Sequence, residues 1–269
     1  MNGTPAIELR RVTKRFRTPT GSVYTALRDL DLTVAPGEFC AVVGPTGCGK
    51  STTLSLVSGL TRASAGDVLV DGQPVQGIGD GVAFMFQTDA VFPWRSVLGN
   101  VAAGPLFRGV PKREAHAKAR DWLRRVGLGG FEDRHPHQLS GGMRKRVALA
   151  QSLITEPRIL LMDEPFSALD VQTRAIMSNE LLGLWEQTRP SVVFITHDLE
   201  EAIALADKVV VMTVGPGTVK ATFDIDLPRP RTVQEIRFEP RFVELYSQIW
   251  ETLRDEVQLA YARTTTAAA

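Results

Sequence analysis

A glycine-rich run near the start of the chain constrains the fold most. It reads Gly44-Pro45-Thr46-Gly47-Cys48-Gly49-Lys50-Ser51 and fits the pattern G-x-x-x-x-G-K-[ST]. The continuously apolar segment 39–43 precedes it, as expected of a strand buried on both faces of a parallel sheet. A helix is predicted from Lys50 to about Gly59. This strand–loop–helix order favours an α/β fold.

The residue types of this run fit a cradle for phosphate groups. The glycines allow the backbone to curl so that successive N–H groups point at phosphate oxygens, and the start of the helix adds partial positive charge. Lys50 is expected to reach the β- and γ-phosphates, and Ser51 to ligate Mg²⁺. An incidental glycine-rich turn is the alternative, which the flanking strand and helix disfavour. The residues predicted to bind the nucleotide here are Gly44, Pro45, Thr46, Gly47, Cys48, Gly49, Lys50, Ser51 and Thr52.

Composition narrows the classes of protein that remain. The chain has 269 residues, 43% hydrophobic and 23% charged, which is enough to bury a sizeable core. Its 31 Lys and Arg against 30 Asp and Glu give a net charge of +1, so bulk charge does not support nucleic-acid binding. No apolar run reaches membrane-spanning length and the start does not resemble a secretory signal, so we expect a cytoplasmic protein. Because disulfides are rare in the cytoplasm, the two cysteines, Cys40 and Cys48, are expected to be unpaired thiols.

Hydrophobic patterning predicts where strands and helices lie. Residues 7–12 and 30–34 alternate as half-buried antiparallel strands do. The segment from about 89 to 151 is predicted to be helical, and an amphipathic helix is expected over 112–126. From residue 159 onward, short apolar strands alternate with helical stretches, which favours a parallel sheet covered by helices. Those strands are expected at 159–162, 191–195 and 209–212.

The C-terminal region is predicted to be an appendage. The proline-rich segment 227–231 has the composition of a linker, and residues 242–257 are predicted to form an amphipathic helix. The Thr/Ala-rich tail after Arg263 is predicted to be disordered.

Two adjacent carboxylates follow the predicted strand at 159–162. Burial of that strand would carry Asp163 to its carboxyl end, beside the phosphates, where Asp163 would hold Mg²⁺ directly or through water. Glu164 would then polarise an attacking water as general base. A solvated strand end is the ordinary alternative for such a pair, and the phosphate-binding run upstream disfavours it.

A third motif, Leu139-Ser140-Gly141-Gly142-Met143, stands between the first two. With it the sequence resembles the ATP-binding-cassette (ABC) family over about residues 6–225, and Ser140, Gly141 and Gly142 resemble the family's signature. A hydroxyl and two glycine amides at a helix start form a second anion site, although a plain helix cap is the alternative. The resemblance implies a homodimer of head-to-tail subunits that sandwiches two ATP molecules.

The resemblance also assigns roles to single residues. Gln87 resembles the glutamine that senses Mg²⁺ and the attacking water, and Asp170, at the end of Ser-Ala-Leu-Asp, resembles the D-loop residue that reaches across the dimer. His197 resembles the switch histidine that contacts the γ-phosphate. Phe16 resembles the aromatic residue that stacks on adenine, and Tyr24 is the alternative.

The implied fold is an ABC-type P-loop NTPase with a RecA-like parallel core, an N-terminal antiparallel β-subdomain and an inserted α-helical subdomain. The predicted boundaries are 1–88 and 156–226 for the core with its β-subdomain, 89–155 for the helical subdomain and 227–269 for the C-terminal part. Lys145 and Gln151 depart from the family's usual Gln and Arg, and we expect neither to touch the site chemistry.

Finer features resemble the nitrate/sulfonate/taurine import subfamily. They are residues 92–97, residues 142–144 and the segment 227–231. Physically, Phe92-Pro93-Trp94 forms a stiff apolar loop that suits a groove for a coupling helix from a membrane subunit, with local core packing as the alternative.

The resemblance therefore implies the ATP-hydrolysing, energy-coupling subunit of a bacterial importer for nitrate, sulfonate, taurine or a related small solute. It implies ATP and Mg²⁺ as ligands, two transmembrane permease subunits and an external periplasmic or lipid-anchored binding protein as partners, and a peripheral location on the inner face of the cell membrane. The alternative is a soluble ABC-type ATPase that regulates or remodels a macromolecule. A P-loop kinase would leave the signature unexplained.

Overall fold

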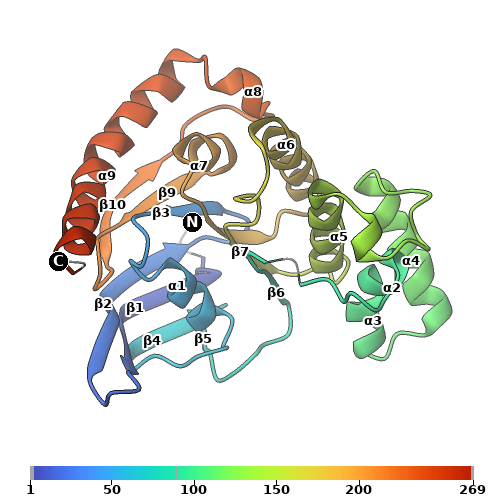
Figure 1. Ribbon diagram of the computed structural model, residues 1–269, viewed down its shortest axis with the longest axis horizontal. Helices are drawn as coiled ribbons and strands as arrows, with labels where there is room; N and C mark the ends of the chain where they lie inside the picture. The colour runs from blue at the N-terminus through green and yellow to red at the C-terminus, as the bar shows by residue number, and fades with distance from the viewer. Residues whose placement is uncertain (1–2, 89, 268–269) are drawn as a thin grey trace. The chain divides into compact units, whose positions relative to one another are not determined.

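The chain divides into two compact units in the computed structural model, which describes residues 3–88 and 90–267 (Figure 1). One unit joins the N-terminal part, up to Asp80, to the C-terminal part from Arg189 onward. The other comprises Gly81–Thr188. This division differs from the predicted helical subdomain of 89–155, because strands β6 (Val82–Met85) and β7 (Ile159–Asp163) belong to the same unit as the helices between them.

An antiparallel sheet opens the first unit. Its strand order is β2-β1-β4-β5, and the bounds are β1 (Ile7–Arg17), β2 (Val23–Val34), β4 (Ala65–Val70) and β5 (Gln73–Pro74). Ile7 pairs with Val34 and Leu9 with Leu32 in the β1–β2 ladder. Alternate apolar side chains are buried, as the period-2 pattern predicted, so the expected antiparallel strands are confirmed.

The first unit also contains a mostly parallel set of strands. Strand β3 (Phe39–Val43) pairs in parallel with β8 (Ser191–Ile195) on one side and with β9 (Lys208–Met212) on the other, and β10 (Val219–Asp224) adds an antiparallel edge. Every residue of β3 and β8 is buried. Continuous burial explains their unbroken apolar sequences. Helices α1 (Lys50–Val57) and α7 (Leu199–Leu205) complete this part.

The second unit is a parallel strand pair with a helical insertion. Strands β6 and β7 pair in parallel, with Val82 opposite Ile159. In α4 the predicted apolar face is buried through Ala115, Ala119 and Leu123, so the amphipathic helix is confirmed. The helices of this unit are α2 (Val97–Val101), α3 (Ala103–Phe107), α4 (Lys112–Arg125), the 3-10 helix η1 (Pro136–Gln138), α5 (Gly141–Leu153) and α6 (Val171–Thr188).

The predicted linker is anchored to the first unit rather than loose. Arg231 is buried and donates to the carbonyl oxygens of Ala206 (2.7 Å) and Leu227 (2.8 Å). Arg229 donates to Asp207 Oδ1 at 2.7 Å. These guanidinium groups supply the partners that an irregular backbone segment needs for a fixed path, which composition alone did not reveal.

Two helices follow, α8 (Val233–Ile236) and α9 (Pro240–Ala267). The prediction of a disordered tail after Arg263 is wrong up to Ala267, because α9 continues that far. Extending a helix that is already nucleated adds one hydrogen bond per residue, which offsets the weaker helix propensity of the three threonines that follow Arg263. Within residues 3–88 and 90–267, no helix, α9 included, is both long and apolar enough to cross a membrane.

Helix α9 holds the hairpin between β9 and β10 by charged groups; Figure 1 shows it alongside both strands. Glu256, which is buried, accepts the backbone N–H of Val214 at 2.7 Å and pairs with Lys220 Nζ at 2.9 Å. Arg263 donates to the carbonyl oxygen of Gly215. Burial by itself would raise the pKa of Glu256, but the Val214 amide and the Lys220 ammonium more than offset it, so the pKa lies below its ordinary value of 4.5.

We expect Glu256→Gln to lower the free energy of unfolding at pH 7 by about 1–3 kcal/mol, because the Lys220 pair loses its charge. A lowered pKa in the folded state stabilises the protein above the unfolded-state value near 4.5, and this contribution disappears as pH falls through the lower folded-state value. Urea unfolding of both proteins from pH 7 to pH 3 should therefore show a difference that shrinks below about pH 4.5. Glu251→Gln, at an exposed position of α9, is the control; an equal loss of stability there would contradict this role of Glu256.

Candidate functional site

The glycine-rich loop connects β3 to α1 and closes around the ammonium of Lys50. Gly47 (φ 77°) and Gly49 (φ 102°) have left-handed backbone conformations, and a Cβ on Gly49 would stand 2.5 Å from a methyl of Leu27. Lys50 Nζ donates to the carbonyl oxygens of Gly44 (2.8 Å) and Pro45 (3.0 Å). The side chain is only 7% exposed. The predicted loop therefore forms with its cation held at its centre.

The residues in and next to this loop include two hydroxyl side chains and a buried thiol. Ser51 and Thr52 lie in the first turn of α1, as predicted. The thiol of Cys48 is buried, which raises its pKa above the ordinary value of 9.0 and disfavours the reactive thiolate. Cys40 and Cys48 are both free thiols. Gly217 of the β9–β10 hairpin packs against the loop so closely that a Cβ there would overlap the carbonyl oxygen of Cys48.

A cavity of about 660 Å³ opens beside the loop within the first unit. Pro45, Thr46 and Gly47 form part of its wall, and exposed His197, just after β8, forms another part. Asp198 caps α7 by accepting the N–H of Glu201 at 3.1 Å, which fixes the turn that carries His197. The structure thus brings His197 to the same cavity as the loop predicted to bind phosphate.

The C-terminal helix supplies another wall of this cavity, which the sequence analysis missed. The α9 side chains at the cavity are Trp250, Leu253, Val257, Ala260, Tyr261 and Arg263. They recur at spacings of three and four residues, the signal of one helix face. The sequence predicted an amphipathic helix over 242–257, but an amphipathic pattern does not by itself reveal what the apolar face meets.

The aromatic residue at the cavity is Tyr24 rather than Phe16. Tyr24 lines the cavity, and its hydroxyl donates to the carbonyl oxygen of Gly47 at 3.4 Å. Phe16 pairs with Tyr24 across the β1–β2 ladder but is not among the lining residues. Lys14 Nζ lies 4.8 Å from the centre of the Phe16 ring. The geometry therefore favours the alternative from the sequence, Tyr24, for contact beside the loop.

In the second unit Gln87 and Glu164, the residues predicted to sense the attacking water and to act as general base, are joined by a hydrogen bond. Gln87, two residues beyond β6, donates through Nε2 to Glu164 Oε2 at 3.3 Å. Asp163 ends β7, and Glu164 follows it with a positive φ of 44°, a conformation that costs free energy in a non-glycine residue. The Glu164 carbonyl oxygen accepts the N–H (3.2 Å) and the hydroxyl (3.0 Å) of Ser167. This turn holds the strained residue in place.

Two further predicted residues cap helices in the same unit. Ser140 precedes α5, and its hydroxyl accepts the N–H of Met143 at 3.3 Å. Asp170 precedes α6 and accepts the N–H groups of Thr173 (3.0 Å) and Gln172 (3.1 Å). The bond from Thr173 is the main reason that the pKa of Asp170 lies below its ordinary value. Ser140 is thus a helix cap. The amides of Gly141 and Gly142 still lie in the first turn of α5, so the cap is compatible with an anion site there.

The expectation that Lys145 and Gln151 avoid the site chemistry is wrong for Lys145. Its Nζ donates to the backbone carbonyl oxygen of Gln87 at 2.8 Å. The two residues are 58 positions apart, so no local pattern relates them. Gln151, by contrast, lines a separate apolar groove.

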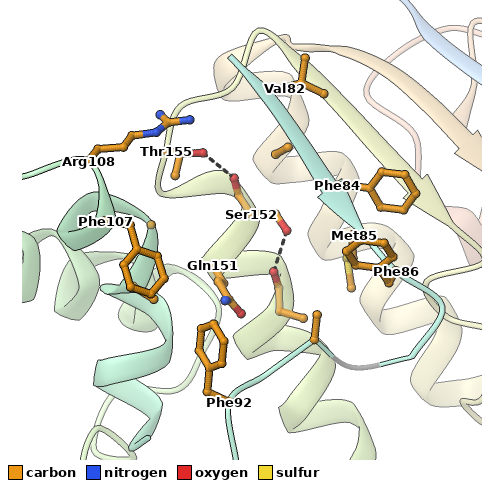
Figure 2. Close-up of a pocket in the computed structure, with 15 residues that line it drawn as sticks. Val82, Phe84, Met85, Phe86, Phe92, Phe107, Arg108, Gln151, Ser152 and Thr155 are labelled. Carbon is orange, nitrogen blue, oxygen red and sulfur yellow. Dashed lines mark hydrogen bonds between the residues drawn. The ribbon is translucent and has the colours of Figure 1, made fainter. Parts of the chain in front are cut away.

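That groove has a volume of about 490 Å³ and lies within the second unit (Figure 2). Phe84 and Phe86 stack at 4.3 Å on one side of it, and Figure 2 shows Phe92 and Phe107 on the side of Gln151. Its lining residues are Val82, Ala83, Phe84, Met85, Phe86, Ala90, Phe92, Ala103, Gly104, Phe107, Arg108, Ala148, Gln151, Ser152 and Thr155. Trp94, predicted to belong to this feature, is 73% exposed and does not line it.

Comparison with known proteins identifies the family of this chain. The family model described as "ABC transporter" matches residues 27–167, just over half of the chain. An uncharacterized ABC transporter ATP-binding protein of Methanocaldococcus jannaschii is 45% identical, covering 93% of this chain and 92% of that protein. The taurine import ATP-binding protein TauB of Pseudomonas putida is 42% identical, covering 88% and 91%.

Of two further similar proteins, one is much longer than this chain and one was solved as a dimer. The bicarbonate transport ATP-binding protein CmpC of Synechococcus elongatus is 38% identical, covering 90% of this chain but 37% of that protein. An ATP-binding cassette solved as a dimer in a post-hydrolysis state, bound to ADP and Pi, is 28% identical with a TM-score of 0.73, covering 82% of this chain and all of that one. The predicted P-loop NTPase fold of the ABC type is confirmed. The chain belongs to the ABC transporter family and is an ATP-hydrolysing cassette of that family.

Proposed function

We propose that this chain is the energy-coupling subunit of an importer for a small anionic or zwitterionic solute such as taurine, another sulfonate, nitrate or bicarbonate. The observation that carries the proposal is the loop closed around Lys50, which shares one cavity with His197. Relatives named for taurine import and bicarbonate transport support the solute class. The solute itself does not enter this chain, because its selection belongs to the permease and an external binding protein.

The phosphate-binding role is assigned to the loop and to α1. The amides of residues 44–49 and the ammonium of Lys50 are the donors for the triphosphate, together with Ser51 and Thr52. Mg²⁺ is assigned to Ser51, Gln87 and Asp163. Hydroxyl, amide and carboxylate oxygens are hard ligands, so the chemistry of this set fits Mg²⁺. When bound, the metal neutralises charge on the phosphates.

Hydrolysis is assigned to the paired residues of the second unit. Glu164 takes the proton of the attacking water, and Gln87, hydrogen-bonded to it, orients that water. His197 contacts the γ-phosphate from the cavity wall. Tyr24 is the better-placed aromatic for the nucleotide's base than Phe16, because Tyr24 lines that cavity.

We further assign a homodimer in which Ser140, Gly141 and Gly142 of one copy engage the γ-phosphate bound to the other, with Asp170 at the contact between copies. The amides of Gly141 and Gly142 lie in the first turn of α5, at the positive end of a helix dipole, which suits an anion. A neighbour solved as a dimer supports this assembly.

The groove in Figure 2 is assigned to a short helix of the permease. Its wall is mostly apolar, and Phe107 on it is 69% exposed. Arg95 lies over both Phe92 and Phe107 at 5.3 Å from each ring centre, so a cation stands beside these two rings. Two such permease subunits would hold the dimer on the inner face of the membrane.

Substitution of Lys50 tests the phosphate site. We expect Lys50→Ala to weaken ATP binding at least tenfold, which is about 1.4 kcal/mol, because the charged donor is lost. Trp250 lines the same cavity, so its fluorescence should report binding, and Trp250→Phe should lose that signal. Arg254→Ala, at an exposed position of α9, is the control. Unaltered affinity in Lys50→Ala would remove the phosphate role of the loop.

Substitution of Glu164 tests the general base. We expect Glu164→Gln to retain ATP binding, to hydrolyse at least about 100-fold more slowly and to form an ATP-dependent dimer measurable by light scattering. In that background, Ser140→Asp retains a helix-capping oxygen but places negative charge toward the partner's phosphate, so the protein should bind ATP and stay monomeric. Rapid hydrolysis by Glu164→Gln would reject the base, and dimerisation by the double variant would reject the signature contact.

Uptake in a deletion strain tests the transport role. Loss of uptake of one solute from a panel of taurine, other sulfonates, nitrate and bicarbonate should follow deletion and be restored by the wild-type gene. Phe107→Ala should hydrolyse ATP normally but fail to restore uptake or to co-purify with the permease. Phe238→Ala is the matched control, since Phe238 is 74% exposed and lies outside the groove. Full restoration by Phe107→Ala would exclude the groove as the permease contact.

A further inference from the structure

Helix α5 carries a buried cation five residues after the signature serine. Lys145 is only 4% exposed, and lysine is rarely buried without polar partners because its charge must be desolvated. Its Nζ donates to the backbone carbonyl oxygen of Gln87 at 2.8 Å. The signature helix and the segment that carries Gln87 are therefore joined by a charge-assisted hydrogen bond inside one unit.

The contact falls at a position where the backbone needs an external partner. Gln87 lies in a bend beyond the end of β6, outside the ladder between β6 and β7. Its side-chain amide donates to Glu164 Oε2 at 3.3 Å. The backbone position of Gln87 sets where that amide lies. Lys145 is therefore connected to Glu164 indirectly, through the backbone and then the side chain of Gln87.

We propose that Lys145 is a positioning residue for ATP hydrolysis, which holds the Gln87 amide against Glu164 and ties it to the helix that begins at Ser140. The proposal rests on the functions proposed for Gln87 and Glu164. A movement of α5 when Ser140 engages a second copy would then be transmitted to the site of water attack in the same subunit. The lysine, where the family resemblance leads to glutamine, gives the link a longer reach and a full charge.

Replacement of the ammonium by a side chain of similar shape tests the link. We expect Lys145→Met to lower kcat for ATP hydrolysis by about 10- to 100-fold, the scale of a misplaced catalytic group, and to leave the KM for ATP within about twofold. The KM should hold because the phosphate-binding loop belongs to the other unit. Lys145→Arg, which keeps cationic donors, should recover most of the rate. The control is Lys118→Met, an exposed lysine of the same unit paired with Glu156 at the surface.

A double-mutant cycle with Gln87→Ala separates positioning from general packing. Lys145 contacts the backbone of Gln87, but its effect on Glu164 passes through the Gln87 side chain. In the Gln87→Ala background, Lys145→Met should therefore cause no further loss of kcat. Additive losses, or equal loss in Lys145→Arg and Lys145→Met, would overturn the inference.

The remaining outcomes are also decisive. If Lys145→Met unfolds, the same cycle is run with Lys145→Gln, which keeps a neutral donor and matches the residue of the family resemblance. A wild-type rate in Gln87→Ala would overturn this inference together with the proposed role of Gln87. Additivity combined with a slow Glu164→Gln would overturn the Lys145 link alone and leave the proposed function standing.

Discussion

The candidate site depends on the hydrogen bonds between the ammonium of Lys50 and the backbone of its own loop. A loop that turns backbone N–H groups inward also places carbonyl groups at its rim, and the carbonyl oxygens of Gly44 and Pro45 accept from Lys50. The left-handed conformations of Gly47 and Gly49 make this curl possible without steric cost. The cation is thus preorganised, so anion binding does not have to order it.

The surroundings of this loop are built from distant parts of the chain. The β9–β10 hairpin packs on it through Gly217, and α9 fixes that hairpin through Glu256 and Arg263. A segment more than 200 residues away thereby stabilises the wall of the same cavity. The C-terminal helix is consequently an integral part of the first unit and not an appendage.

Predictions from sequence succeeded where the signal was local. The loop 44–51, the buried strands β3 and β8 and the amphipathic α4 follow from residue spacing and from unbroken apolar runs. Gln87 and Glu164 were each related to the attacking water in separate arguments, and only the structure shows the hydrogen bond between them. Phe16 was preferred to Tyr24 by resemblance, but both flank one turn of a hairpin and only the path of the strands decides which meets the cavity.

The sequence by itself determined the class of fold and the loop proposed to bind phosphate, because a glycine-rich loop between a buried strand and a helix has few conformations that satisfy its backbone. Tertiary structure alone decided the contact of Lys145 with Gln87, the route of segment 227–231 and the place of α9 at the cavity. These depend on buried charges that find partners 25 to 58 residues away. A buried cation must be paired, but its sequence does not say with which carbonyl or carboxylate.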